Sequence, residues 1–308
     1  MMTNIAYWIV YGFTYLISLL PFRALYVLSD FISLITYYII RYRRKIVRKN
    51  LQTAFPEKSK EEIIRIERKF YRWFSDYIFE TLKLLSISEK SLKKHLEVKG
   101  MDDVEYYFDR GQDVALILGH YCNWEWLSAI GIAYNRYYRK AAVGLIYHRL
   151  RSAVMDRLFL KLRSNHLGDC IHKKKILRFI AKYREENQRY VMGYISDQAP
   201  KWENIHLFIP FLNHDTPVFT GGERIMRKMK NAVLFIKMTR PKRGYYVADL
   251  KFITDEPQNL PQNEVTIRFF NLLEQSIRQQ PELYLWTHNR WKRTKEEFER
   301  RKAAQTTT

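Results

Sequence analysis

The chain has few of the residues that dominate disulfide-stabilised or low-complexity proteins. Among its 308 residues there are two cysteines, 11 glycines and 9 prolines. Two cysteines cannot form a disulfide framework for a chain of this length, which indicates a reducing environment. Because 47% of the residues are apolar, the composition also excludes a disordered or collagenous protein. We therefore expect a globular chain with a sizeable core.

Acidic residues are scarce compared with basic ones. The chain has 32 Asp and Glu against 53 Lys and Arg, so its formal net charge is +21. This excess predicts an acidic partner: nucleic acid, an anionic membrane surface, or an acidic protein or substrate. The basic residues are spread along the chain or follow an apolar segment, and the sequence has no recognisable nucleic-acid-binding module. We expect an anionic membrane surface and no nucleic acid, with a non-enzymatic basic membrane- or nucleic-acid-binding protein as the alternative.

The first 22 residues carry no charged side chain. Residues 5–20 are apolar, and a helix of roughly 20 residues crosses a hydrocarbon core about 30 Å thick. A second apolar segment, residues 24–40, contains Asp30 and precedes a cationic cluster that favours the cytoplasmic side. The cluster consists of Arg41, Arg43, Arg44, Lys45, Arg48 and Lys49. We predict that residues 1–45 form a membrane anchor, either one span or one span followed by an interfacial helix.

The N-terminal segment has two alternatives to a membrane anchor. The first is a cleaved signal peptide, which has basic residues before its apolar region and small residues at its cleavage site, and the sequence shows neither. The second is a helical hairpin buried in a soluble domain, because the first apolar segment contains Tyr7, Trp8, Tyr11 and Tyr15. Membrane attachment is the prediction that we carry forward.

The rest of the chain alternates between apolar runs and amphipathic helices. Residues 59–85 have the apolar spacing of a helix, with Ser59 as the expected N-cap. Short aliphatic runs predict strands at 114–118, 141–146, 190–195, 232–238 and 245–252. Helical patterns are found at 124–133, 174–183, 220–229 and 264–279. We therefore predict an α/β domain over residues 46–302 and a polar tail over residues 303–308.

His120 and Glu125 directly follow the predicted strand 114–118. Asn123 suits the N-cap of a helix that begins at Trp124, which puts Glu125 in the first turn. A turn between His120 and Glu125 lets the two side chains meet, whereas a continuous helix would place them on different faces. A histidine held by a carboxylate is a general base for a hydroxyl group. The alternative is a solvent-exposed histidine and a glutamate that only stabilises the start of a helix.

Five segments carry a resemblance to a known family. They are NLQTAFPE at 50–57, GHYCNWE at 119–125, YISDQ at 194–198, PFLNHDT at 210–216 and YLWTHNRWK at 284–292. In this order, and preceded by an apolar anchor, they resemble the lipid A late acyltransferases of the lysophospholipid acyltransferase superfamily. These enzymes are the lauroyl and myristoyl transferases of lipopolysaccharide assembly. The resemblance extends over residues 45–293.

The resemblance implies a glycerolipid acyltransferase-like fold, with a mixed central sheet flanked by helices and an N-terminal membrane-anchoring helix. It implies that the chain acts at the cytoplasmic face of the inner membrane and moves a fatty acyl chain from acyl-acyl carrier protein to a hydroxyl of a lipid A precursor. His120 would be the general base and Glu125 the group that orients it. No cofactor or metal is implied.

Four side chains are predicted to bind the substrate: Arg163, Asp197, Asn123 and Gln198. The resemblance places Arg163 of KLRSN and Asp197 in the site, and a guanidinium suits a sugar phosphate or the oxyanion of the reaction. The sequence Tyr147-His148-Arg149 departs from the Tyr-Arg-Pro that is common in the family. Another lipid acceptor, such as a lysophospholipid, an aminolipid or a glycolipid, is therefore the alternative.

Two other kinds of chemistry have weaker support. Cys122 is close to His120 in sequence, but an acceptor hydroxyl can attack a thioester without a covalent acyl-cysteine. His166, Cys170 and His172 are also close in sequence, but no second cluster with the spacing of zinc ligands accompanies them. We expect neither a cysteine nucleophile nor a metal site.

Overall fold

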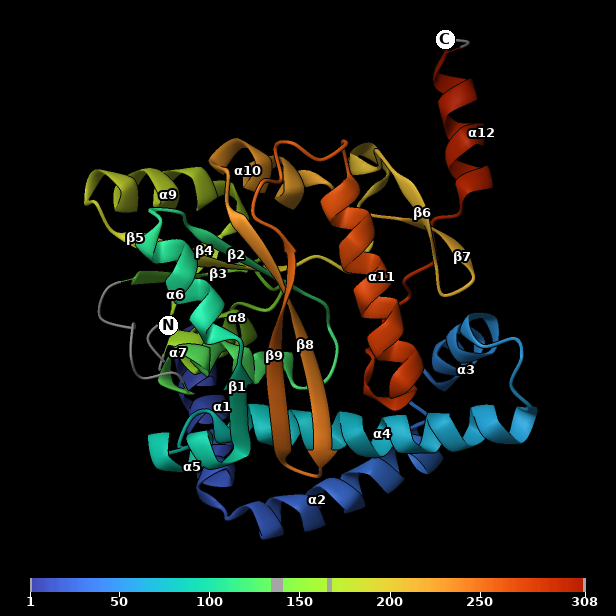
Figure 1. Ribbon diagram of the computed structural model, residues 1–308. Coiled ribbons are helices and arrows are strands. Elements are labelled where there is room, and N and C mark those ends of the chain that lie inside the picture. Colours follow the sequence, from blue (N-terminus) through green and yellow to red (C-terminus); the bar gives the residue numbers. More distant parts are fainter. Residues whose placement is uncertain (1, 134–140, 165–167, 307–308) are drawn as a thin grey trace.

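The computed structural model describes residues 2–133, 141–164 and 168–306. Its centre is a seven-stranded sheet in the order β1-β9-β8-β2-β5-β3-β4 (Figure 1). Neighbouring strands are parallel except for the antiparallel pair β8 and β9. The strands of this sheet are β1 (Leu96–Lys99), β2 (Val114–Leu118), β3 (Ala141–Tyr147), β4 (Asp169–His172), β5 (Arg189–Ile195), β8 (Ala232–Lys242) and β9 (Tyr245–Thr254). The prediction of an α/β fold with a mixed central sheet flanked by helices is confirmed.

All five predicted strands are present, and four short ones were not predicted. β2 is the VALIL run, and all five of its residues are buried, as a continuous apolar strand requires. The unpredicted strands are β1 and β4 at the two edges of the sheet, and β6 (Phe208–Phe211) and β7 (His214–Pro217), which form a separate antiparallel pair. β1 and β4 each have four residues and bury only one of them, so they leave no apolar pattern in the sequence.

Two long helices agree with their predicted ranges. α4 (Lys60–Lys83) begins with a capping box, in which the Ser59 hydroxyl accepts from the Glu62 backbone N–H and the Glu62 carboxylate accepts from the Ser59 N–H. α11 (Glu264–Gln279) packs on β2, β8 and β9 and buries Phe269, Leu273 and Ile277. The other helices of the body are α3 (Arg44–Ala54), α5 (Glu89–His95), α6 (Met101–Asp109), η2 (Trp124–Ala129), α7 (Ile130–Ala133), α8 (Ala153–Ser164), η3 (Lys173–Lys175), α9 (Ile176–Glu185), η4 (Trp202–Asn204), α10 (Gly221–Met229) and η5 (Pro281–Leu283).

The N-terminal segment forms two apolar helices. They are α1 (Met2–Leu19) and α2 (Phe22–Leu34), and the π-helix η1 (Ile35–Ile40) continues α2. Within the described residues, Phe22–Ile40 is the helical segment long and apolar enough to cross a membrane, judged by length and composition only. The membrane span expected at residues 5–20 corresponds to α1, which this criterion does not select, and the predicted anchor over residues 1–45 stays a prediction. In Figure 1, α2 runs alongside α4 at the lower edge of the molecule.

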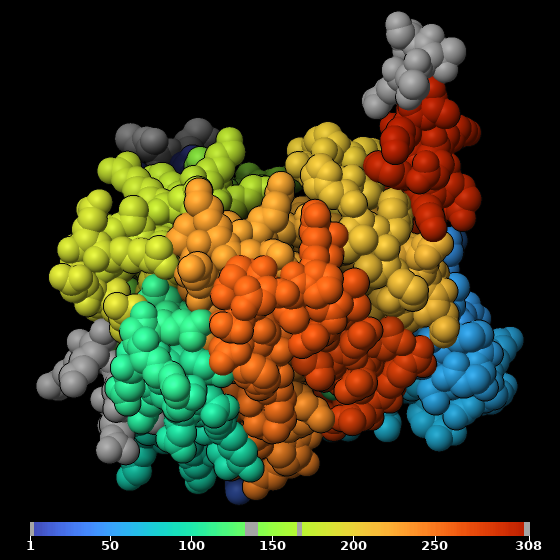
Figure 2. All heavy atoms as spheres, turned by 45° about the horizontal axis from the view of Figure 1, so that its top comes forward, coloured from blue at the N-terminus to red at the C-terminus, as the bar shows by residue number. Residues whose placement is uncertain are grey.

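The C-terminal residues form a helix that extends into the predicted polar tail. α12 (Lys295–Thr306) projects from the rest of the molecule in Figure 2, where it is coloured red. Most of its side chains are charged or polar and lie in solvent. The expected tail over residues 303–308 therefore begins inside a helix, and residues 307 and 308 lie outside the described part of the chain.

Candidate active site

His120 lies just beyond the carboxyl end of β2. β2 and β5 are parallel neighbours in which Leu118 is opposite Ile195, so the residues that follow the two strands emerge at the same edge of the sheet. The backbone N–H of Ser196 donates to the carbonyl of Leu118 at 3.1 Å, which continues the pairing by one step. Asp197 comes next in the chain and reaches His120. Ligands of open α/β sheets bind at this end of the strands.

Gly119 allows the carboxyl ends of β2 and β5 to pack closely against α11. A Cβ at residue 119 would lie 2.8 Å from a methyl carbon of Leu273 and 3.4 Å from Cγ of Asp197. The first distance is shorter than carbon atoms tolerate, so with a larger residue at this position the Leu273 side chain of α11 would have to shift. The glycine is needed here for close packing rather than for an unusual backbone conformation.

His120 is held by two side chains that follow β5. Its Nδ1 lies 2.6 Å from Oδ1 of Asp197, and its Nε2 lies 3.1 Å from Nε2 of Gln198. Burial alone would raise the pKa of the Asp197 carboxyl, but the charge and hydrogen bonds of His120 outweigh it and hold that pKa below its usual value. An ionised Asp197 accepts the Nδ1–H, which leaves the lone pair of the ring on Nε2. Nε2 is therefore the atom that can take a proton.

Glu125 contacts Arg163 instead of His120. Nε of Arg163 donates to Oε2 of Glu125 at 2.9 Å, and Nη2 donates to Oε1 at 2.7 Å, which makes a two-pronged pair between η2 and α8. The indole N–H of Trp124 donates to the same carboxylate at 3.2 Å. The expectation that Glu125 orients His120 is therefore corrected: Asp197 makes that contact, and the acceptor positions of Glu125 are occupied by Arg163 and Trp124.

Arg163 is largely buried and keeps its charge through this pair. Burial alone would lower the pKa of the guanidinium, but the Glu125 carboxylate more than compensates and raises it above its usual value. The guanidinium also lies 5.3 Å from the ring centre of Phe159 on the same helix. Among the described residues, none accepts from its third nitrogen, Nη1.

These side chains line one large cavity of about 1170 Å³. His120, Glu125, Arg163 and Gln198 are all on its wall. The apolar part of the wall comes from the sheet and from η2, α7 and α6, and includes Leu116, Leu127, Ile130, Val143, Leu145 and Phe108. The exposed charged residues of the wall are six cations and one acid: Arg149, Arg151, Lys173, Lys174, Lys201, Arg224 and Glu203. The cavity therefore combines an apolar interior with a basic opening.

Asn123 does not line the cavity. Its side chain is fully buried, its Oδ1 accepts from the backbone N–H of Trp126, and its Nδ2 donates to Glu80 at 2.8 Å. The expected helix cap is present, although the first turn is a 3-10 helix. The predicted contact between Asn123 and substrate is not supported by this position, because both ends of the amide have protein partners in the interior.

Cys122 is in an environment that does not favour a nucleophile. The residue is fully buried, and burial raises the pKa of its thiol to about 12, so the thiol is protonated at neutral pH. In the described part of the chain, no group of three or more His, Cys, Asp or Glu residues has the arrangement of a metal site. His166 of the sequence cluster lies outside the described residues.

The C-terminal motif YLWTHNRWK supplies parts of the site that the sequence did not predict. The N–H of Leu285 donates to the carbonyl of His120 at 3.2 Å, and the backbone N–H of Cys122 donates at 2.7 Å to the carbonyl of Leu283, the residue just before the motif. Arg290 is 1% exposed, and its positive charge contributes to the low pKa of Asp197. The motif therefore helps to hold the turn after β2 in place. In the sequence, its aromatic and basic residues were the feature that could have indicated this role.

Comparisons with known proteins agree on one group of relatives. A family model described as bacterial lipid A biosynthesis acyltransferase matches residues 1–293. The lipid A biosynthesis palmitoleoyltransferase of Escherichia coli (strain K12) is 21% identical over 300 residues, which cover 93% of this chain and 92% of the relative. The lipid A biosynthesis lauroyltransferase of the same organism is 24% identical over 292 residues, 92% of this chain and 90% of the relative. A lipid A biosynthesis acyltransferase of Haemophilus influenzae is 23% identical over 254 residues, 81% of this chain and 78% of the relative.

Proposed function

Because the chain belongs to the bacterial lipid A biosynthesis acyltransferases, we propose that it transfers a fatty acyl chain from acyl-acyl carrier protein to a hydroxyl group of a lipid A precursor, with His120 as the general base. The family match confirms the predicted resemblance and makes the chain an acyltransferase of lipid A biosynthesis. We further propose that it acts at the cytoplasmic face of the inner membrane.

One observation carries this proposal: the proton-accepting nitrogen, the apolar wall and the basic opening belong to a single cavity. An acyl chain gains about 0.8 kcal/mol for each CH₂ group that it buries, so the apolar interior suits the chain of the donor. A lipid A precursor carries phosphate groups and acyl carrier protein is acidic, so the six exposed cations suit both partners. The cavity is somewhat larger than typical small-molecule pockets, as two lipid substrates would require.

In the proposed reaction, the acceptor hydroxyl replaces Gln198 beside Nε2 of His120. The hydroxyl proton moves to Nε2 while the oxygen attacks the carbonyl carbon of the thioester. Asp197 stabilises the imidazolium that forms, through its 2.6 Å contact with Nδ1. The tetrahedral intermediate then loses its carbon–sulfur bond, and the sulfur leaves with the proton from Nε2. The products are an ester and the free thiol of the carrier.

Arg163 has a separate place in this scheme. Its pair with Glu125 fixes the guanidinium on the cavity wall, and Nη1 remains for a phosphate oxygen of the acceptor or for the oxygen of the tetrahedral intermediate. In this proposal Glu125 acts through Arg163 and is a positioning residue.

A transfer assay tests the proposal. The purified full chain is incubated with a tetra-acylated lipid A precursor and a panel of acyl-carrier-protein and acyl-coenzyme A donors, and the lipid products are identified by mass spectrometry. We expect an ester product with acyl-carrier-protein donors and a loss of about 100-fold or more in the His120→Ala variant. His206→Ala, at an exposed histidine that does not line the cavity, is the matched control. Unchanged turnover by His120→Ala would contradict the proposed base. Transfer only to lysophospholipids, aminolipids or other glycolipids would contradict the proposed acceptor.

A further inference from the structure

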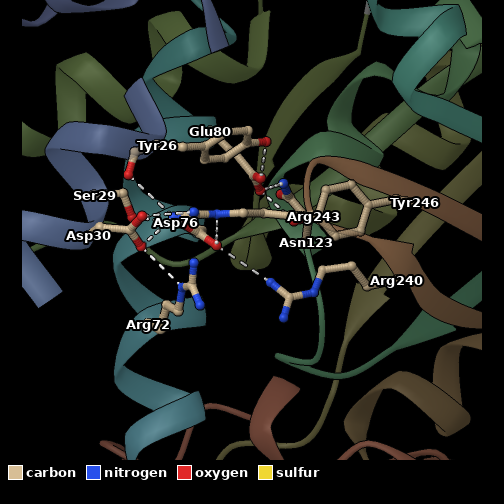
Figure 3. A network of polar contacts seen from close by, with 10 residues as sticks. All are labelled: Tyr26, Ser29, Asp30, Arg72, Asp76, Glu80, Asn123, Arg240, Arg243 and Tyr246. Carbon is tan, nitrogen blue, oxygen red and sulfur yellow. Dashed lines mark hydrogen bonds and ion pairs between the residues drawn. The ribbon is translucent and has the colours of Figure 1, made fainter. Parts of the chain in front are cut away.

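α2 is held against the body of the protein by a network of charged side chains (Figure 3). Arg243, in the turn between β8 and β9, donates to Asp30 of α2 at 2.8 Å and to Asp76 of α4 at 2.6 Å. The hydroxyl of Ser29 donates to Asp76 at 2.6 Å, and Arg72 of α4 donates to Asp30 at 3.0 Å. Asp76 is nearly inaccessible to solvent. The middle of α2 is therefore fixed to α4 and to the sheet.

The same network reaches the turn that carries His120. The hydroxyl of Tyr26, in the first half of α2, donates to Oε1 of Glu80 at 2.9 Å. The other oxygen of Glu80 accepts from the amide of Asn123 at 2.8 Å and from the hydroxyl of Tyr246 at 2.5 Å (Figure 3). The packing of α2 is thus continuous with the interior of the catalytic domain, so α2 is a fixed part of the fold.

α4 cannot follow α2 into hydrocarbon. The two helices run side by side, and α4 exposes several cationic side chains, of which Arg72 is paired with Asp30 of α2. These are Arg65, Arg68, Lys69 and Arg72. Charged side chains at the centre of a bilayer are costly. If α2 crossed the membrane, it would either take these cations with it or break the ion pairs of Asp30 and leave this carboxylate among lipid tails.

The opposite side of α2 and η1 is apolar and faces away from the protein. Val27 is 70% exposed, Phe31 61% and Ile39 74%. Leu34 and Ile40 continue this stripe. Exposed arginine and lysine side chains stand at both ends of the segment: Arg23 at the start and Arg41, Arg43 and Lys45 after the end. A helix with one apolar face and cationic ends has the pattern of an interfacial helix on anionic lipid.

We propose that Phe22–Ile40 lies in the plane of an anionic phospholipid leaflet and does not cross the bilayer. The side with Asp30 stays on α4, and the stripe from Val27 to Ile40 enters the boundary between headgroups and acyl chains. The tyrosine Tyr38, which is half exposed on the same segment, suits this depth. This inference rests on the membrane attachment in the proposed function and does not depend on acyl transfer.

The two ends of the segment test the topology. Arg23→Cys and Lys45→Cys, each in a Cys170→Ser background of the full chain, are expressed and collected in inverted inner-membrane vesicles. A membrane-impermeant maleimide is added from the outer, originally cytoplasmic, surface. An in-plane helix exposes both cysteines to the reagent. A helix that spans the bilayer exposes only one of them until the vesicles are lysed, and this outcome would overturn the proposal.

Depth along the helix gives an independent measurement. Spin labels are attached at Val27→Cys, Phe31→Cys and Ile39→Cys of the protein in vesicles that contain phosphatidylglycerol, and their accessibility to oxygen and to a polar nickel complex is compared. The matched control is Leu177→Cys, an exposed apolar position on α9. We expect similar shallow depths at all three positions and an aqueous signal at residue 177. A maximum of depth at residue 31, or aqueous signals at all three positions, would contradict an in-plane helix on lipid.

Discussion

Nδ1 of His120 lies 2.6 Å from the carboxylate of Asp197, 77 positions further along the chain. Replacing Asp197 by Asn removes the negative charge that stabilises the imidazolium and allows the wrong ring nitrogen to carry the proton. We expect Asp197→Asn to lower the rate of acyl transfer by about 100-fold or more, with little change in the binding of the acceptor. Single-turnover rates with the carrier-protein donor measure this effect. Asp215→Asn, at an acid that is half exposed, is the control and should retain activity.

Glu125 and Arg163 should contribute to the stability of the fold as a unit. Each single alanine variant leaves a charged partner in a mostly buried position, where breaking a pair costs about 3 kcal/mol or more in the free energy of unfolding. The double variant leaves no unpaired charge, so its loss of stability should be smaller than the sum of the two single losses. A double-mutant cycle by thermal unfolding measures this coupling. Additive losses would show that the pair does not act together.

Arg163→Lys separates charge from geometry at the same position. Lysine keeps a positive charge but cannot make two parallel hydrogen bonds to Glu125 and still offer a third nitrogen to a ligand. We therefore expect this variant to fold and to lose most of its transfer activity. A variant with unchanged kcat and KM would mean that only the charge of Arg163 is needed.

Glu80 should make the stability of the protein depend on pH. Burial raises the pKa of its carboxyl from the ordinary value of 4.5 to about 7. The folded state therefore binds this proton more tightly than the unfolded state does. The resulting contribution of Glu80 to the free energy of unfolding is fully present below about pH 4.5 and is lost as the pH rises to about 7. The difference corresponds to about 3 kcal/mol. The free energy of unfolding should differ less between pH 5 and pH 7.5 in Glu80→Gln than in the unsubstituted chain. An equal difference in the two proteins would contradict the raised pKa of Glu80.

Gly119→Ala should disturb the site through packing. The added Cβ would lie 2.8 Å and 2.9 Å from the two methyl carbons of Leu273, which predicts a loss of about 1–3 kcal/mol in the free energy of unfolding. Leu273→Ala in the same chain should recover part of the transfer rate, because it removes the clash. Gly12→Ala is the control, since no heavy atom beyond its own turn of helix lies within 4 Å of its Cβ position. A fully active Gly119→Ala variant would contradict the role of close packing.

Thiol reagents should leave the enzyme active. The Cys122 thiol is buried, and its pKa is raised to about 12, so it does not react at neutral pH. In a Cys170→Ser background, treatment with iodoacetamide at pH 7 should change the transfer rate by less than about twofold. Rapid inactivation that the acyl donor prevents would favour an acyl-cysteine over direct attack by the acceptor hydroxyl.

Much of the fold could be predicted from local patterns. Val114–Leu118 and Glu264–Gln279 appear at the predicted positions because their apolar residues follow the period of a buried strand and of an amphipathic helix. The four short strands escaped prediction because Leu96–Lys99 and Asp169–His172 bury one residue each, and Phe208–Phe211 and His214–Pro217 have only four residues. Their pairing depends on partners that are distant in the sequence.

The amino-acid sequence alone determined the α/β class, the family and the chemical types in the site: an imidazole after a buried strand, a nearby carboxylate and a guanidinium. Tertiary structure decided which of these groups touch. Parallel pairing of β2 and β5 brings Asp197 to His120, and the approach of α8 brings Arg163 to Glu125. It also decided that the segment Phe22–Ile40, long and apolar enough by composition to span a membrane, is tied by Asp30 to Arg243. Spacing in a sequence describes neighbours along one element, whereas hydrogen bonds and ion pairs depend on distances that only the packed chain sets.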